Sequence, residues 1–120
     1  PCTGTGTLRR NPDLKWRTEP ADLERLVTAQ RAIMAAAVPL VRPGGSLIYG
    51  TCSLLAREND EQVAWFEAQY PGWLRRAADD VLQGQGARLD PQATANGLLR
   101  LLPDRDGCDG FFAVRWERPK

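Results

Sequence analysis

Apolar residues recur along this chain at two spacings, and each spacing predicts a different element. Between residues 22 and 41, and again between 57 and 70, hydrophobic side chains return every three or four positions, as on one face of a helix. We therefore expect helices near 21–40 and 57–70. The first apolar stripe comprises Leu23, Leu26, Val27, Met34, Ala37, Val38 and Val41, and the second comprises Val63, Phe66 and Tyr70.

Short apolar runs predict the strands, which we expect near 46–51, 73–77 and 110–117, with a further short one at 98–102. The run near 46–51 follows a helix and a glycine turn, which favours a buried strand of a parallel sheet. The segment 83–97 is rich in glycine, glutamine, asparagine and proline, which predicts a loop, and 104–110 predicts a turn. The order of helices and strands indicates an α/β layer.

The first helix carries signals at both ends. Thr18 or Glu19 is placed to cap its N-terminus, and Pro20 falls in the first turn, where a missing N–H leaves no hydrogen bond unmade. Pro39 ends or kinks the helix, because proline cannot donate an interior main-chain hydrogen bond.

Composition narrows the class of protein. The 120 residues fit one small domain, and 42% hydrophobic and 26% charged residues are ordinary for a soluble chain. No run approaches the roughly 18 uncharged apolar residues of a membrane span, and the first residues carry no apolar leader. We therefore expect a cytoplasmic protein.

The net charge of +1 conceals a local basic cluster, and arginine supplies 14 of the 16 basic residues. Arg9, Arg10, Lys15 and Arg17 lie close together along the chain, with only Asp13 among them. On charge alone, this cluster favours a solvated loop over a phosphate-binding surface.

The chain has no histidine and three cysteines. The absence of histidine excludes Ser-His-Asp and Cys-His catalysis within these residues. The spacing of the cysteines fits neither a metal site nor a Cys-x-x-Cys redox motif. An odd number of widely spaced cysteines without secretory signs predicts reduced thiols.

Two of the cysteines occupy comparable places. Cys52 falls at the carboxyl end of the strand near 46–51, and Cys2 lies in a Gly/Thr loop of the kind that follows a strand. If those two strands are neighbours, their ends lie about 4.8 Å apart and both thiols face one cleft. The alternative is two small buried hydrophobic residues. Cys108 lies in a turn, where a structural role is favoured.

Three segments carry a resemblance to a known family. Residues 1–17, which begin Pro-Cys-Thr-Gly-Thr-Gly-Thr, resemble the Pro-Cys motif of RNA cytosine-C5 methyltransferases of the sun protein, or ribosomal RNA small-subunit methyltransferase B, family. Residues 41–54 resemble the Thr-Cys motif with its leading strand, and Glu58-Asn59 continues the match. Residues 109–113 resemble the closing Asp-Gly-Phe-Phe strand. The segments stand in the family's order and span the chain, with 83–97 the least matched.

This resemblance implies a fold and a cofactor. Members carry a Rossmann-like class I methyltransferase domain that binds S-adenosylmethionine and makes 5-methylcytosine. Residues 1–120 would be the carboxyl-terminal half of that domain, without the cofactor-binding half and the RNA-binding domain, and would be inactive alone. No residue of this chain is assigned to the cofactor, and no metal is expected.

The resemblance also implies roles for single residues. Cys52 would be the nucleophile that adds to carbon 6 of cytosine, and Cys2 would assist release of the methylated base. A thiolate is required, and we expect the helix starting near Arg57 to lower the pKa of Cys52 with its N-terminus. Pro1 and Thr51 would position the substrate.

The resemblance also changes the role that we expect for the basic cluster. Arg9, Arg10, Lys15 and Arg17 would hold phosphates of RNA, most simply ribosomal RNA. Trp16 would stack on a base or, as we favour, pack within its loop. The alternative function is a non-catalytic RNA-binding or interaction module of the same shape, which would need neither thiol.

Overall fold

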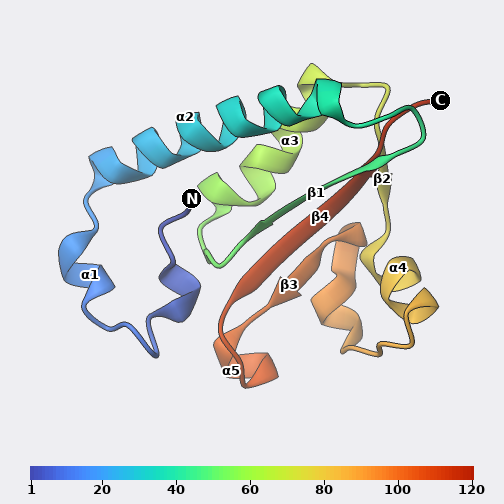
Figure 1. Cartoon of the computed structure of the whole chain (residues 1–120). Coiled ribbons are helices and arrows are strands. Elements are labelled where there is room, and N and C mark those ends of the chain that lie inside the picture. The colour runs from blue at the N-terminus through green and yellow to red at the C-terminus, as the bar shows by residue number, and fades with distance from the viewer.

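The computed structural model describes residues 1–120 as one four-stranded sheet with helices packed on it (Figure 1). Strand β4 (Phe111–Glu117) is central, and β1 (Ser46–Thr51) pairs along one side of it. On its other side β2 (Leu74–Arg76) and β3 (Leu99–Leu101) pair with different parts of β4. The α/β class is confirmed, and the four strands fall where the apolar runs predict them.

The helices extend the predicted set. The α-helices are α1 (Leu14–Arg17), α2 (Pro20–Ala37), α3 (Asp60–Gln69), α4 (Ala78–Gly84) and α5 (Pro103–Asp106), and 3-10 turns occur at Thr5–Thr7, Val38–Leu40, Ala56–Glu58 and Pro91–Gly97. Helices α2 and α3 correspond to the two predicted helices. None of the helices combines the length and the hydropathy needed to cross a membrane.

The predicted signals at the ends of α2 operate as expected. Glu19 is the N-cap residue, and its main-chain N–H donates to the Asp22 carboxylate at 3.0 Å. Pro20 is the first helical residue. The α-helix ends before the 3-10 turn that contains Pro39, because the proline removes the main-chain donor that the next turn would need.

The core lies between β4 and the two long helices. Alternate residues of β4, namely Phe112, Val114 and Trp116, are buried. Phe66 of α3 stacks on Trp116 with ring centroids 4.1 Å apart, and Met34 of α2 joins the same cluster. This packing fixes α2 and α3 on one face of the sheet (Figure 1). It also brings the first turn of α3 beside the middle of α2, where Gln62 contacts Val27 and Gln30.

Two expectations about secondary structure are wrong, and two elements have other boundaries than expected. The strand near 46–51 is not a buried parallel strand: it pairs antiparallel with β4, and Ile48 is 68% exposed. The segment 83–97 is not one loop, because α4 reaches Gly84 and Asp90 caps a 3-10 segment by accepting the Gln92 N–H at 2.8 Å. The turn at 104–110 begins with the short helix α5. The second long helix begins at Asp60 rather than Arg57, after a 3-10 turn.

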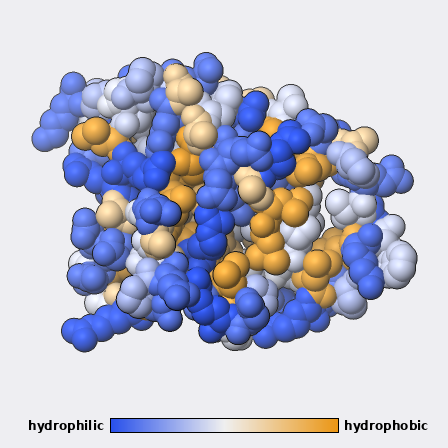
Figure 2. Space-filling model, turned by 180° about the vertical axis from the view of Figure 1, so that it is seen from behind, coloured by the Kyte–Doolittle hydropathy of each residue, from blue (hydrophilic) through white to orange (hydrophobic).

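Several large apolar side chains remain on the surface. Seen from behind, orange hydrophobic groups interrupt the blue hydrophilic surface (Figure 2). The exposed apolar residues are Trp16, Ile33, Leu40, Ile48, Leu54, Leu74, Leu89 and Phe111. Two of them, Ile48 and Phe111, belong to the paired strands β1 and β4.

Candidate active site

Two cysteines that are 50 residues apart in the sequence meet in the fold. The Sγ atoms of Cys2 and Cys52 lie 3.3 Å apart, within hydrogen-bonding reach, and all three cysteines are free thiols. Both residues line a cleft of about 410 Å³ between α2 and β1, and nine of its thirteen lining residues are hydrophobic. The prediction that both thiols face one cleft is confirmed.

Gly6 and Gly110 connect the three segments of the chain that meet at the cysteine pair. The Gly6 N–H donates to the Cys52 main-chain oxygen at 2.8 Å, and the Gly110 N–H donates to the Gly6 oxygen at 2.8 Å. A Cβ on Gly6 would lie 2.5 Å from the Cys52 oxygen, and a Cβ on Gly110 would lie 2.8 Å from the Gly6 Cα. Such distances leave no room for a side chain, so the loop of Cys2, the turn of Cys52 and the start of β4 form one unit.

Hydroxyl groups hold the turn that carries Cys52. The Leu54 N–H donates to Thr5 Oγ1 at 2.8 Å, which ties this turn to the Cys2 loop a second time. Thr51 is buried, and its hydroxyl donates to Asn59 Oδ1 at 2.6 Å. Asn59 Nδ2 in turn donates to the Ser53 oxygen at 2.8 Å. Thr51 lines the cleft, but its hydroxyl is directed into the protein.

A buried carboxylate holds the loop of Cys2. Glu58 is fully buried and accepts hydrogen bonds from the Thr3 N–H at 2.8 Å and the Thr3 hydroxyl at 2.7 Å. Gln30 Nε2 donates to Glu58 Oε1 at 3.1 Å and to the Pro1 oxygen at 2.9 Å. Pro1 itself is exposed and lines the cleft beside Cys2.

The electrostatic expectation for Cys52 is wrong in sign. Burial raises the pKa of the Cys52 thiol, the neighbouring Cys2 raises it further, and the charge of Glu58 adds to the effect. The helix expected to lower this pKa starts only at Asp60, and burial together with Cys2 and Glu58 sets the direction of the shift. In the resting protein the Cys52 thiol therefore stays protonated at neutral pH.

The predicted RNA-binding cluster lies on the surface, but its arginines already have partners. The guanidinium groups of Arg9 and Arg10 both pair with Asp109, just before β4, and Arg17 pairs with Asp13. All three side chains remain more than half exposed.

The neighbouring aromatic residue departs from expectation. Trp16 is 81% exposed, so the expectation that it packs within its loop is wrong. The Lys15 ammonium lies 4.9 Å from the centroid of its ring. Helix α1 has only one turn and buries none of its residues, which leaves nothing for the indole to pack against.

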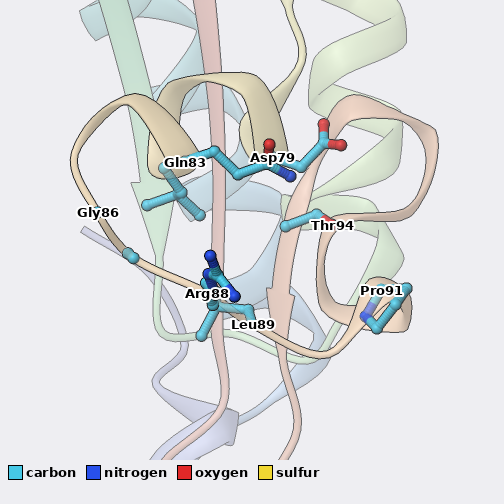
Figure 3. Close-up of a pocket in the computed structure, with 9 residues that line it drawn as sticks. Asp79, Gln83, Gly86, Arg88, Leu89, Pro91 and Thr94 are labelled. Carbon is cyan, nitrogen blue, oxygen red and sulfur yellow. The ribbon is translucent and has the colours of Figure 1, made fainter.

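A larger cavity lies away from the cysteines. It has a volume of about 760 Å³ between α4 and the Pro91–Gly97 segment (Figure 3). Its labelled polar side chains are Asp79, Gln83, Arg88 and Thr94. It contains no thiol, and no cluster of three histidine, cysteine or acidic side chains anywhere in the chain could hold a metal ion. The cysteine pair is therefore the candidate active site.

Sequence reasoning missed the polar side chains behind the cysteines. Gln30 and Gln62 are buried, and each occupies a helical position beside apolar core residues. Gln30 lies between Val27 and Met34 on the apolar stripe of α2, and a polar residue on such a stripe is a signal of a buried hydrogen-bonding role.

Comparison with known proteins places the chain in a family. The model of the family described as 16S rRNA methyltransferase RsmB/F matches residues 1–117. Ribosomal RNA small subunit methyltransferase B of Pectobacterium carotovorum is 41% identical over 115 residues, which are 96% of this chain and 24% of that protein.

Solved structures that resemble the chain include two with high TM-scores. The crystal structure of PH0851 superposes with a TM-score of 0.85 at 32% identity, over 98% of this chain and 25% of that one. NSun6 from Pyrococcus horikoshii with SFG superposes with a TM-score of 0.76 at 27% identity, over the whole of this chain and 28% of that one. The chain thus spans about a quarter of the length of these relatives. It belongs to the 16S rRNA methyltransferase RsmB/F family.

Proposed function

We propose that residues 1–120 are the carboxyl-terminal half of the catalytic domain of a cytoplasmic enzyme that methylates carbon 5 of a cytosine in ribosomal RNA. The observation that carries the proposal is the 3.3 Å separation of Cys2 Sγ and Cys52 Sγ in a cleft. Family membership and the quarter-length match to named ribosomal RNA methyltransferases support it.

Cys52 is the nucleophile in this proposal. Its sulfur adds to carbon 6 of the cytosine, and the electrons of the 5,6 double bond move to carbon 5, which becomes able to take a methyl group. The Cys52 proton leaves to water as the carbon–sulfur bond forms. The raised pKa of Cys52 supports this order, because the resting thiol stays protonated until the base is in place.

S-adenosylmethionine supplies the electrophilic methyl group. Its use is supported by the family and by the relative crystallised with SFG, an analogue of this donor. The cleft beside the cysteines has no acidic side chain that could accept hydrogen bonds from ribose hydroxyls. We therefore assign no residue of this chain to the donor, and we expect the chain alone to be inactive.

Cys2 assists release of the product. After methylation the hydrogen on carbon 5 leaves as a proton to water, its bonding electrons restore the 5,6 double bond, and the carbon–sulfur bond breaks. Cys2 then donates its thiol proton to the departing sulfur of Cys52 and takes a proton from water, which restores the starting pair of thiols. Its 3.3 Å distance from that sulfur supports this role.

The exposed side chains around the site serve RNA binding. Arg9, Arg10, Lys15 and Arg17 contact phosphates, and the solvent-facing indole of Trp16 stacks on a base. Pro1 and Thr51 bound the cleft where the target cytosine enters and position it.

The full-length protein tests the proposal with 16S ribosomal RNA transcript and S-adenosylmethionine carrying a labelled methyl group. Cys52→Ala should abolish label transfer and adduct formation. Cys2→Ala should accumulate a covalent protein–RNA adduct visible on a denaturing gel. A Cys108→Ala variant is the matched control and should behave as the wild type. Normal turnover by Cys52→Ala would favour the alternative, a non-catalytic RNA-binding or interaction module.

A further inference from the structure

A continuous chain of polar side chains runs behind the cysteine pair. The Arg31 Nε donates to Gln62 Oε1 at 2.8 Å, and Gln62 Nε2 donates to Gln30 Oε1 at 2.8 Å. Gln30 Nε2 then donates to Glu58 Oε1 at 3.1 Å. Gln30, Gln62 and Glu58 are all buried, and they come from α2, α3 and the 3-10 turn before α3. These hydrogen-bonded side chains thus connect the interface between α2 and α3 to the loop that carries Cys2.

This polar chain ends on both peptide groups that flank Cys2. On one side Gln30 Nε2 donates to the Pro1 oxygen, and on the other Glu58 accepts from both the N–H and the hydroxyl of Thr3. A buried carboxylate is unfavourable unless donors satisfy it, and Glu58 receives three such bonds. The main chain on each side of Cys2 is therefore fixed, and its thiol is left to face Cys52.

We propose that Glu58, together with Gln30, is a positioning residue for the release step, because it holds the Cys2 sulfur against the Cys52 sulfur. Glu58 has no hydrogen bond to either thiol, and the inference rests on the proposed function. Without its carboxylate the Pro1–Thr3 segment loses its anchor and Cys2 moves away from the sulfur that must leave. Methyl transfer then proceeds, but the carbon–sulfur bond to the product persists.

Four substitutions in the full-length protein test the positioning. Glu58→Ala removes the anchor, whereas Glu58→Gln keeps an acceptor for the Thr3 N–H and offers an amide donor to the Thr3 hydroxyl. Gln30→Met removes the donors while it keeps the length of the side chain. Glu61→Gln is the matched control, since Glu61 is an exposed carboxylate three residues away.

The first measurement does not depend on methyltransferase activity. Diamide takes one hydrogen from each thiol, is reduced to its hydrazine and leaves a Cys2–Cys52 disulfide, which mass spectrometry of peptides quantifies. Disulfide formation should be at least tenfold slower in Glu58→Ala and Gln30→Met than in the wild type. Glu58→Gln and Glu61→Gln should remain within about threefold of the wild type.

The second measurement is the covalent adduct with 16S ribosomal RNA transcript in the presence of S-adenosylmethionine. Glu58→Ala and Gln30→Met should accumulate at least tenfold more adduct than the wild type, as is expected of Cys2→Ala, while the first methyl transfer stays within about threefold. Glu58→Gln should restore release.

The outcomes separate the two proposals. Wild-type rates of disulfide formation together with a wild-type adduct level in folded Glu58→Ala overturn the positioning role. If that variant does not fold, Gln30→Met decides by the same criteria. Slow disulfide formation with no adduct in any variant, including Cys2→Ala, supports the positioning of Cys2 and overturns the proposed methyltransferase chemistry.

Discussion

The Gly6 N–H donates a hydrogen bond of 2.8 Å to the main-chain oxygen of Cys52. This bond joins the loop that carries one thiol to the turn that carries the other. A Cβ atom at Gly6 would lie within 2.7 Å of two main-chain oxygens, those of Cys52 and Gly110. The spacing of the two sulfur atoms therefore depends on the absence of a side chain at residue 6.

Gly6→Ala should destabilise the protein by about 1–3 kcal/mol, because main-chain atoms rather than a flexible side chain would have to move. Urea unfolding followed by tryptophan fluorescence measures the change. Gly84→Ala is the matched control, since nothing lies within 4 Å of a Cβ at that position. Equal stability of the two variants would contradict this account of the loop.

The alkylation of Cys52 should depend on pH with a midpoint above that of the same cysteine in the urea-unfolded protein. Burial and Cys2 raise its pKa in the folded state, so less thiolate forms at a given pH. Mass spectrometry after iodoacetamide pulses at a series of pH values measures the midpoint. Cys2→Ala should move it to lower pH, and an unchanged midpoint would disprove the coupling of the two thiols.

The same shift predicts how stability depends on pH. A folded-state pKa above the unfolded one means that the folded protein holds the proton more tightly. The contribution of Cys52 to stability is therefore complete below the ordinary cysteine pKa and is lost as the pH rises through the folded-state value. Urea unfolding of the wild type and of Cys52→Ala across alkaline pH tests the sign, since only the wild type should show this loss.

Neutralising Arg9 and Arg10 should weaken RNA binding by the full-length protein. Each phosphate contact that is lost should reduce the slope of log affinity against log salt by about 0.7 on single-stranded RNA. Fluorescence anisotropy of Arg9→Gln/Arg10→Gln against a salt series measures it. Arg25→Gln removes another exposed, carboxylate-paired arginine, on α2, and should leave the slope unchanged. If both variants gave the same slope, Arg9 and Arg10 would not contact RNA.

Trp16→Ala should leave the stability of the protein nearly unchanged and weaken its binding to RNA. Because the side chain is 81% exposed, the free energy of unfolding should change by less than about 0.5 kcal/mol. Affinity for RNA should fall roughly tenfold, since stacking on one base contributes about 1–3 kcal/mol. A loss of stability without a loss of affinity would instead assign the indole to packing in the full-length protein.

The chain of residues 1–120 alone should not bind S-adenosylmethionine, because its cleft lacks an acidic partner for the ribose. Isothermal titration calorimetry measures this, with the full-length protein as the positive control. A micromolar dissociation constant for the chain alone would contradict its assignment as half of a catalytic domain.

The elements with strong periodicity could be predicted from the sequence. Helix α2 and strand β4 bury one face each, so their apolar residues follow the repeat of the backbone. Helix α4 was missed because its segment runs into a stretch rich in glycine and glutamine, and only contact with the sheet reveals its apolar side. Its Val81 and Leu82 line a small apolar cavity together with Leu99 and Val114 of the sheet.

The candidate site could be predicted only in part. Cys52 follows the apolar run near 46–51, and Cys2 lies in a Gly/Thr loop of the kind that follows a strand, so their meeting could be predicted from the sequence. The partners of Glu58 depend on how α2 and α3 align, and that alignment comes from packing such as Phe66 on Trp116. The pKa of Cys52 depends on what buries it, so its direction was inaccessible to reasoning from neighbours in the sequence.

Gly110 contacts Gly6 and stands immediately before β4, the strand that supplies Phe112, Val114 and Trp116 to the core. Strand β4 therefore positions the hydrophobic core and, through Gly110 and Gly6, also the segments that carry the two sulfur atoms. A sequence change that shifts β4 would therefore displace the loop of Cys2 and the turn of Cys52 even where the protein stays folded. Under the proposed function, substitutions in the hydrophobic core would thus change product release as well as stability.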